Sequence, residues 1–170
     1  MSDAADARAN VALAWRCVAF DALALRELQA IHRARQRVFT VEQQCAFVDA
    51  DEQDELAHHL AAWLAGEPEP LAYARLLPPG AKYDEASIGR VLTSAAVRGR
   101  GLGRELMARA IAEVDALWPG AGVRISAQTR LERFYASFGF VAVGVPYLED
   151  GIDHTEMLRR GAAAPVDGGA

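Results

Sequence analysis

The sequence contains little lysine and has no excess of positive charge. Lys82 is the only lysine, so almost all of the cationic side chains are arginines. Asp and Glu number 23 against 18 Lys and Arg, which gives a net charge of −5. Proteins that neutralise many phosphates are usually basic, so this balance disfavours general nucleic-acid binding.

Cysteine is also scarce, with Cys17 and Cys45 as the only two. A structural zinc site draws on several Cys and His ligands at short spacing, and the sequence has no such cluster. We therefore expect no metal. One disulfide stays open, but the lack of an export signal favours two unreactive buried thiols.

An acidic run at 49–55 precedes a pair of histidines, His58 and His59. A calcium loop would need Gly at its sixth position and Glu at its twelfth, and the run has neither. We therefore expect a solvated loop and not a metal site. Its negative field would help to attract a cationic ligand.

Long apolar runs are absent: none approaches the roughly 18 residues that crossing a bilayer requires. The acidic start has no basic segment leading into an apolar one, so we expect no membrane contact and a cytoplasmic location. At 170 residues the chain has the size of one domain. Both ends lack the periodicity that buries a face. We expect a domain over 13–160 between flexible tails at 1–12 and 161–170.

Apolar periodicity and turn residues predict alternating strands and helices. The expected strands are 15–20, 59–64, 71–77, 88–93, 123–127, 140–145 and 155–158. Asp21 is a candidate N-cap for a helix that continues to about Val38, and a second helix starts near Leu102 and ends before Pro119.

A third helix is expected where Thr129 and Glu132 match a capping box. It would bury Leu131, Phe134 and Phe138, and end at Gly139. The whole pattern predicts a mixed α/β sheet and not a regular doubly wound one.

The most informative segment is a glycine loop between a strand and a long helix. It consists of Arg98, Gly99, Arg100, Gly101, Leu102, Gly103 and Arg104. Glycines let the backbone approach a ligand closely, and free N–H groups at a helix start suit phosphate oxygens, to which arginines add bidentate bonds. A glycine-rich turn with solvated arginines is the alternative.

Two phosphate-binding motifs fail at this loop. A P-loop needs a lysine, and the dinucleotide fingerprint would need a third glycine at Arg104. The pattern that remains is R-x-x-G-x-G, written Arg98, Gly101 and Gly103. In this form the sequence resembles the GCN5-related N-acetyltransferases, whose pyrophosphate loop has the same pattern.

A second segment supports this resemblance independently. The stretch from Phe134 to Phe140 looks like the family's FYxxxGF element, and Gln128 stands where many members have an asparagine that contacts coenzyme A. The similarity covers roughly 15–160. Segments 38–54 and 147–154 look like signatures of the ElaA-like branch, which narrows the family but not the acceptor.

The resemblance implies a fold, a co-substrate and a set of site residues. The fold would be a single-domain, mostly antiparallel sheet that splays between its fourth and fifth strands. Acetyl-CoA would bind with its pyrophosphate on the loop 98–104, and with its pantetheine against the backbone of Val91, Leu92 and Thr93. Tyr135 would protonate the departing thiolate; a core tyrosine packed with its phenylalanine neighbours is the alternative.

The base that activates the acceptor is less defined. The strand 88–93 carries no glutamate, which is one common family solution. His154 has the most suitable ordinary pKa, with an exposed turn histidine as the alternative interpretation. Glu149, Asp150 and Glu42 are the other candidates.

Together these residues predict an N-acetyltransferase that moves acetyl from acetyl-CoA to a primary amine by direct transfer, without a metal. The acceptor could be a polyamine, another small amino compound, a protein lysine or an N-terminus. A non-catalytic acetyl-CoA-binding or regulatory module is the alternative. Monomer and homodimer both stay open.

Overall fold

An eight-stranded sheet extends through residues 12–161, the part of the chain that this computed structural model describes. Nearly all of the two predicted tails lie outside these residues. The strands are β1 Ala14–Ala19, β2 His58–Trp63, β3 Ala72–Leu77, β4 Ala86–Thr93, β5 Val123–Gln128, β6 Val141–Ala142, β7 Tyr147–Glu149 and β8 Ile152–Arg159. Their order is β1-β2-β3-β4-β5-β8-β6, and β7 also pairs with β8.

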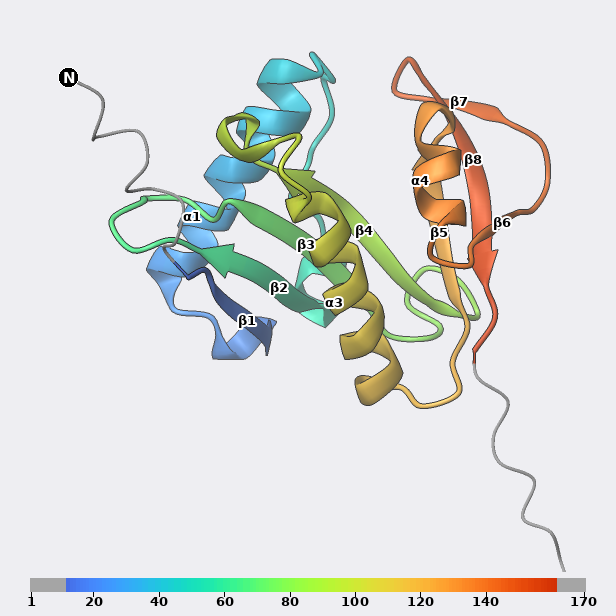
Figure 1. Cartoon of the computed structure of the whole chain (residues 1–170), viewed down its shortest axis with the longest axis horizontal. Coiled ribbons are helices and arrows are strands. Elements are labelled where there is room, and N and C mark those ends of the chain that lie inside the picture. The colour runs from blue at the N-terminus through green and yellow to red at the C-terminus, as the bar shows by residue number, and fades with distance from the viewer. Residues whose placement is uncertain (1–11, 162–170) are drawn as a thin grey trace, which may run out of the picture.

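Helices cover both faces of this sheet (Figure 1). They are α1 Leu25–Arg35, α2 Gln53–Leu56, α3 Leu102–Leu117 and α4 Glu132–Ala136. A π-helical segment, Gln36–Glu42, continues α1, and short 3-10 turns lie at Phe20–Ala22, Ala95–Val97 and Thr129–Leu131. The predicted mixed α/β fold is confirmed.

The two faces of the sheet follow from alternation along β2 and β3. Leu60 and Leu76 point to one face, where they pack with the apolar side of α3. Ala61 and Tyr73 point to the opposite face and pack with Ile31 of α1. Because both faces are covered, every residue of β3 is buried.

The sheet opens between β4 and β5, the only parallel pair of strands within residues 12–161. These strands pair only where Ala86 meets Val123 and Ser87 meets Arg124, although β5 pairs with β8 along its full length. A β-bulge in β4, near Arg90, shifts its register with β3. The predicted splay between the fourth and fifth strands is therefore confirmed.

The predicted start of the first helix is wrong. Asp21 lies in a 3-10 turn, and α1 begins four residues later at Leu25. The Glu27 carboxylate accepts the N–H of Ala24 at 3.0 Å and so supplies the cap from inside the helix.

The predicted capping box at Thr129 is also wrong. The Thr129 hydroxyl contacts the Thr155 hydroxyl at 3.1 Å, and the latter donates to the Glu132 carboxylate. Both side chains therefore bond to β8, and the helix starts only at Glu132. Its buried side chain is Tyr135, whereas Leu131 is exposed. The helix does end before Gly139, which has a φ of 87°.

The acidic run is not a solvated loop. Asp49 and Asp54 are buried and bind the fully buried guanidinium of Arg35, at 2.7 Å and 2.8 Å. Arg75 reaches the same Asp54 oxygen at 2.8 Å. Cations from α1 and β3 thus neutralise the two buried carboxylates of the run inside the molecule. Glu52 and Glu55 are exposed, and α2 forms within the run.

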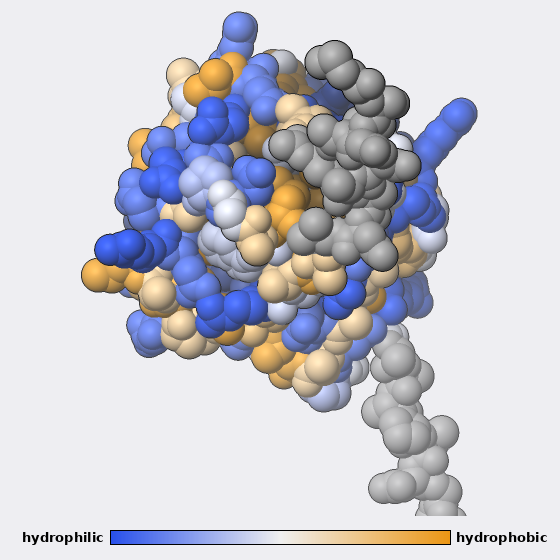
Figure 2. All heavy atoms as spheres, turned by 60° about the vertical axis from the view of Figure 1, so that its left-hand side comes forward, coloured by the Kyte–Doolittle hydropathy of each residue, from blue (hydrophilic) through white to orange (hydrophobic). Residues whose placement is uncertain are grey.

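Both cysteines are free thiols: Cys45 is buried and Cys17 is partly buried. Burial, with Glu113 nearby, raises the pKa of Cys17 to about 12, so this thiol is unreactive near neutral pH. Within residues 12–161, no helix has the length and apolar character needed to cross a bilayer. On the face that Figure 2 shows, hydrophilic side chains predominate and apolar ones are scattered among them.

Candidate active site

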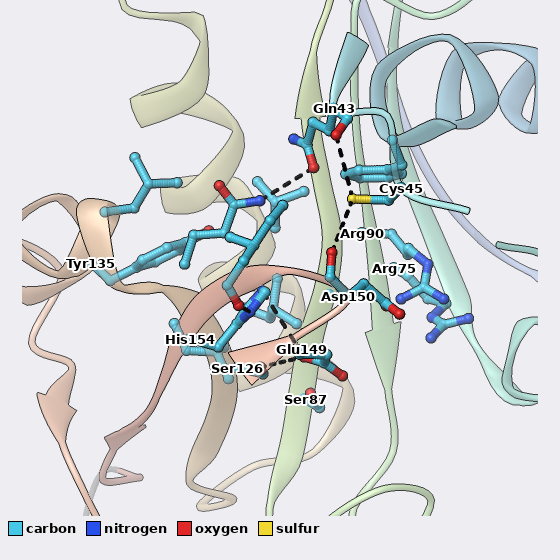
Figure 3. A pocket seen from close by; sticks show the side chains of 18 of the residues that line it. Gln43, Cys45, Arg75, Ser87, Arg90, Ser126, Tyr135, Glu149, Asp150 and His154 are labelled. Atoms are coloured by element: carbon cyan, nitrogen blue, oxygen red, sulfur yellow. Dashed lines mark hydrogen bonds and ion pairs between the residues drawn. The ribbon is translucent and has the colours of Figure 1, made fainter. Parts of the chain in front are cut away.

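A cavity of about 270 Å³ occupies the fork between β4 and β5 (Figure 3). Its walls also include the segment after α1, the helix α4 and the turn between β7 and β8. The residues that carry its polar chemistry are Gln43, Cys45, Arg75, Lys82, Ser87, Arg90, Ser126, Gln128, Arg130, Tyr135, Glu149, Asp150 and His154.

Strained backbone surrounds this cavity. Within residues 12–161, three non-glycine residues have positive φ: Gln44 at 54°, Arg90 at 52° and Asp150 at 50°. Arg90 and Asp150 line the cavity, and Gln44 lies between two lining residues. The Cys45 sulfur lies 3.9 Å from the Asp150 carbonyl oxygen, so two of these segments meet there. Such strain costs about 1–3 kcal/mol per residue and clusters at functional sites.

Tyr135 projects from α4 into the cavity (Figure 3). Its ring packs edge-on against Phe134 and Phe140, and the residue is buried. Burial raises the pKa of Tyr135 to about 12. The phenol therefore keeps its proton at neutral pH and can donate it, or a hydrogen bond, to a group inside the cavity. The tyrosine can therefore be packed with its phenylalanine neighbours and still reach the cavity.

His154 and Gln128 are neighbours across β5 and β8 and line the same cavity. His154 lies on a strand, not in a turn, and is partly buried. Its Nδ1 lies 2.8 Å from the Ile152 carbonyl oxygen, which can only accept, so Nδ1 carries the proton of the neutral ring. Nε2 is then the free basic nitrogen, and it lies 3.9 Å from the Glu149 carboxylate.

Gln128 bridges two walls of the cavity. Its amide nitrogen donates to the Gln43 side chain at 3.3 Å, and its oxygen accepts from Arg130 at 3.0 Å. The longer amide of glutamine thus already has partners in this structure. Any contact with coenzyme A would add to them or replace them.

The glycine loop lies between the 3-10 turn that follows β4 and the start of α3. Gly99 and Gly101 have φ values of 77° and 84°, which L side chains rarely adopt. A Cβ built on either would meet nothing within 4 Å, so open space faces this backbone. Gly103 is helical, and a Cβ built on it would lie 3.9 Å from the Thr93 methyl. A helix start with open, unhindered main chain fits a pyrophosphate.

Two arginines of the loop are tied to neighbouring elements. Arg98 donates to the Thr93 carbonyl at 3.1 Å and pairs with Glu42 at 2.7 Å. Arg104 lies over the Phe138 ring, 5.2 Å from its centroid, and donates to the Ser137 hydroxyl. These contacts therefore hold the side chains of Arg98 and Arg104 in place at the two ends of the loop.

The structure brings together only part of the predicted site. Tyr135, His154, Gln128 and Val91 share the cavity, as do the alternative bases Glu149 and Asp150. The loop residues 98–104, Leu92 and Thr93 lie outside its lining, toward the carboxyl end of β4. Leu92 and Leu102 bury their side chains in the core, which leaves only their main chain for a ligand.

Glu42 is also outside the cavity lining, and its pairing with Arg98 gives it a role at the glycine loop. Sequence reasoning missed the cations at the other end of the cavity, Arg75, Lys82 and Arg90. The one feature of the sequence that could have drawn attention to Lys82 is that it is the only lysine. Across residues 12–161, no group of three or more His, Cys, Asp and Glu side chains is placed to hold a metal ion.

Residues 29–160 match the acetyltransferase (GNAT) domain family. ElaA of Escherichia coli is 37% identical over 147 residues, which span 85% of this chain and 95% of ElaA. Its crystal structure superposes with a TM-score of 0.82 and covers 88% of this chain and 100% of that one.

The crystal structure of an acyl-CoA N-acyltransferase from Pseudomonas aeruginosa gives a TM-score of 0.83 at 43% identity, covering 87% of this chain and 99% of that chain. The UPF0039 protein sll0451 of Synechocystis is 44% identical over 81% of this chain and 86% of its own length. The chain therefore belongs to the GNAT acetyltransferase family and resembles its ElaA branch.

Proposed function

We propose that this protein transfers acetyl from acetyl-CoA to a primary amine. The observation that carries the proposal is that one cavity, at the β4–β5 fork, is lined by both a protonated phenol, Tyr135, and the imidazole of His154. The glycine loop lies at the carboxyl end of the same β4 strand. Family membership supports acyl transfer from coenzyme A, and the cavity chemistry supports an amine acceptor.

The donor would bind along the open edge of β4. Its pyrophosphate would contact the amides of Gly101 and Gly103 and the arginines of the loop. Its pantetheine would extend into the fork, where β4 has left β5 after Ser87. The main chain of Val91, Leu92 and Thr93 is then available to the pantetheine amides or the thioester carbonyl. One backbone donor at that carbonyl is typically worth about 3–4 kcal/mol in the transition state.

The transfer step forms one bond and breaks one. The neutral amine attacks the thioester carbonyl, a C–N bond forms, and the C–S bond then breaks. The amine proton passes to a base, and the thiolate takes a proton or a hydrogen bond from Tyr135. The ordinary thiol pKa is about 8.5, but the desolvation that raises the pKa of Tyr135 also penalises the thiolate. The pKa of the phenol that gives the proton and the pKa of the thiol that receives it therefore shift in the same direction.

His154 is the proposed base. An alkyl amine with a pKa of about 10.4 is neutral in only about 0.1% of molecules near pH 7.4, so a group that removes its proton accelerates attack. The free Nε2 of His154 faces the Glu149 carboxylate at 3.9 Å, which would stabilise the imidazolium once it forms.

Donor binding is tested by thermal unfolding with acetyl-CoA. At about 100 times Kd, ligand linkage adds roughly 2.7 kcal/mol to the free energy of unfolding. A Gly101→Asp variant places a carboxylate at the loop and is expected to lose this stabilisation. Gly66→Asp is the matched control, because Gly66 has a similar φ of 85° and open surroundings but lies in the β2–β3 turn. Equal stabilisation of both variants would contradict the proposed loop site.

Turnover separates an enzyme from a binding module. Thiol release from acetyl-CoA is measured with a panel of amines, and the acetylated product is identified by mass spectrometry. Amine-dependent release supports the transferase. Stabilisation by acetyl-CoA without thiol release from any amine would favour the non-catalytic module.

A further inference from the structure

Two sides of the cavity mouth carry charge that the protein leaves unmatched. Lys82 comes from the loop between β3 and β4, whereas Glu149 and Asp150 lie at the turn between β7 and β8. Among the ion pairs of residues 12–161, none includes Lys82 or Asp150, and Glu149 has only His154 at 3.9 Å. A cation and two carboxylates thus border one cavity without neutralising each other.

The two arginines at the same end of the cavity differ from Lys82, because their charge is already matched. Arg75 lies 2.8 Å from Asp54, and Arg90 lies 2.8 Å from Asp49. A bound anion would have to compete with these buried carboxylates. Of the three cations at this end of the cavity, Lys82 is therefore the one whose charge no carboxylate matches.

Lys82 lines the cavity, and its amine packs against an aromatic ring beside it. The amine lies 5.1 Å from the centroid of the Tyr83 ring. Burial lowers its pKa, Glu149 acts to raise it and Arg90 to lower it. Within residues 12–161, no ion pair joins Glu149 to this amine. An anion bound between them would offset the cost of desolvating the ammonium.

We propose that the acceptor is an α-amino acid, whose carboxylate binds Lys82 and whose amine lies against Glu149 and Asp150. The inference rests on the proposed function and selects one of its acceptor classes. Because Glu149 lies 3.9 Å from the free nitrogen of His154, an amine held there lies beside the base. Polyamines, protein lysines and N-termini have no carboxylate next to the amine and would leave Lys82 unused.

The test compares each common amino acid with its own primary amide as acceptor, by thiol release from acetyl-CoA. For at least one pair, kcat/KM is expected to be about 10-fold or more higher for the acid, as for a hydrogen bond between charged groups. The intrinsic reactivity of the amine would favour the amide over the acid, so it cannot produce the expected preference. The α-amine of an amide resembles a chain's α-amine, with a pKa of about 7.7–8.0, and is more often neutral.

Three variants assign the preference to Lys82. Lys82→Gln is expected to reduce the acid-to-amide ratio to near one, and Lys82→Arg to retain it. Arg130→Gln is the matched control, because Arg130 also lines the cavity but donates to Gln128; this variant should keep the ratio.

Amides that react as well as acids, or a ratio that survives Lys82→Gln, would overturn the inference. Turnover with other amines but with no amino acid would also overturn it, while leaving the proposed transferase intact. Acetyl-CoA binding without turnover on any amine would overturn both.

Discussion

Tyr135 belongs both to the core and to the lining of the cavity. Its ring fills the space between α4 and the sheet, and its hydroxyl reaches the cavity wall. The same burial that stabilises the fold keeps the phenol protonated by raising its pKa to about 12. Core packing and proton donation are therefore not competing explanations for this tyrosine.

Removing this hydroxyl should slow the reaction without displacing the donor. Tyr135→Phe is expected to lower kcat at least ~10-fold, the usual size of a general-acid effect. Acetyl-CoA affinity and melting temperature should change little, because the ring stays in place. Tyr83→Phe, outside the cavity lining, is the control and should retain kcat. An unchanged kcat in Tyr135→Phe would rule out the proposed acid.

At the scale of elements, the buried ion pairs fix the segment that closes the cavity. Arg35 extends from α1 and holds Asp49 by its side chain and its carbonyl, at 2.7 Å and 2.6 Å. Burial alone would raise the pKa of Asp54, but hydrogen bonds from Arg35 and Arg75 outweigh it and leave that pKa lowered. The segment between α1 and α2, which contributes Gln43 and Cys45 to the cavity, is anchored by these bonds.

Arg35→Gln should therefore lower the free energy of unfolding far more than Arg37→Gln does. It removes one of the two arginines that bind each of the buried carboxylates Asp49 and Asp54. Breaking a buried ion pair typically costs about 3–5 kcal/mol in the free energy of unfolding. Arg37 pairs with Glu69 on an exposed surface, and Arg37→Gln should have little effect. Urea unfolding of the two variants measures the difference. Similar losses in both would contradict a structural role for the buried network.

Most strands, the helix α3 and the glycine loop were predictable from the sequence because their signals are local, whereas β7 and α2 were not predicted. Two short apolar segments around a turn rich in Gly and Pro identified β2 and β3, and helical spacing from Leu102 identified α3. The environment of the acidic run was not predictable, because its partners Arg35, Arg75 and Arg90 are distant in the sequence. A run of charge normally faces solvent, and only the fold brings three arginines against it.

In the candidate site, too, some residues could be predicted from local sequence motifs and others could not. Tyr135 and His154 could be named from motifs, but their common cavity depends on where β4 leaves β5. Lys82 belongs to a turn with no local sequence pattern, so its place in the cavity lining became evident only in three dimensions. The residue roles, the acetyl donor, the amine acceptor and the cytoplasmic location stay predictions.

At the scale of the whole molecule, stability should fall on mild acidification. His59 is buried between the Tyr73 hydroxyl, at 2.8 Å, and the Asp54 carbonyl oxygen, at 3.0 Å. These contacts satisfy the neutral ring, with Nε2 donating and Nδ1 accepting. Desolvation lowers the pKa of His59 below its ordinary value despite the nearby Asp54.

The unfolded chain consequently binds a proton more readily than the folded one. Its histidine titrates near pH 6.5, so the free energy of unfolding should decrease as the pH falls below that value. Urea unfolding between pH 8 and 5.5 measures this slope, and His59→Gln should flatten it. A free energy of unfolding that stays constant over this range in the native protein would contradict the assignment.

The short pairing of β4 with β5 has a consequence for how rigidly the two parts of the sheet are connected. Main-chain bonding almost divides the sheet into two half-sheets, β1–β4 and β5–β8, joined at a narrow seam. A donor lying in the gap would act as a temporary extra strand and fasten the halves together. Departure of the spent carrier would then loosen the seam, so that each catalytic cycle also ends with a relaxation of the scaffold.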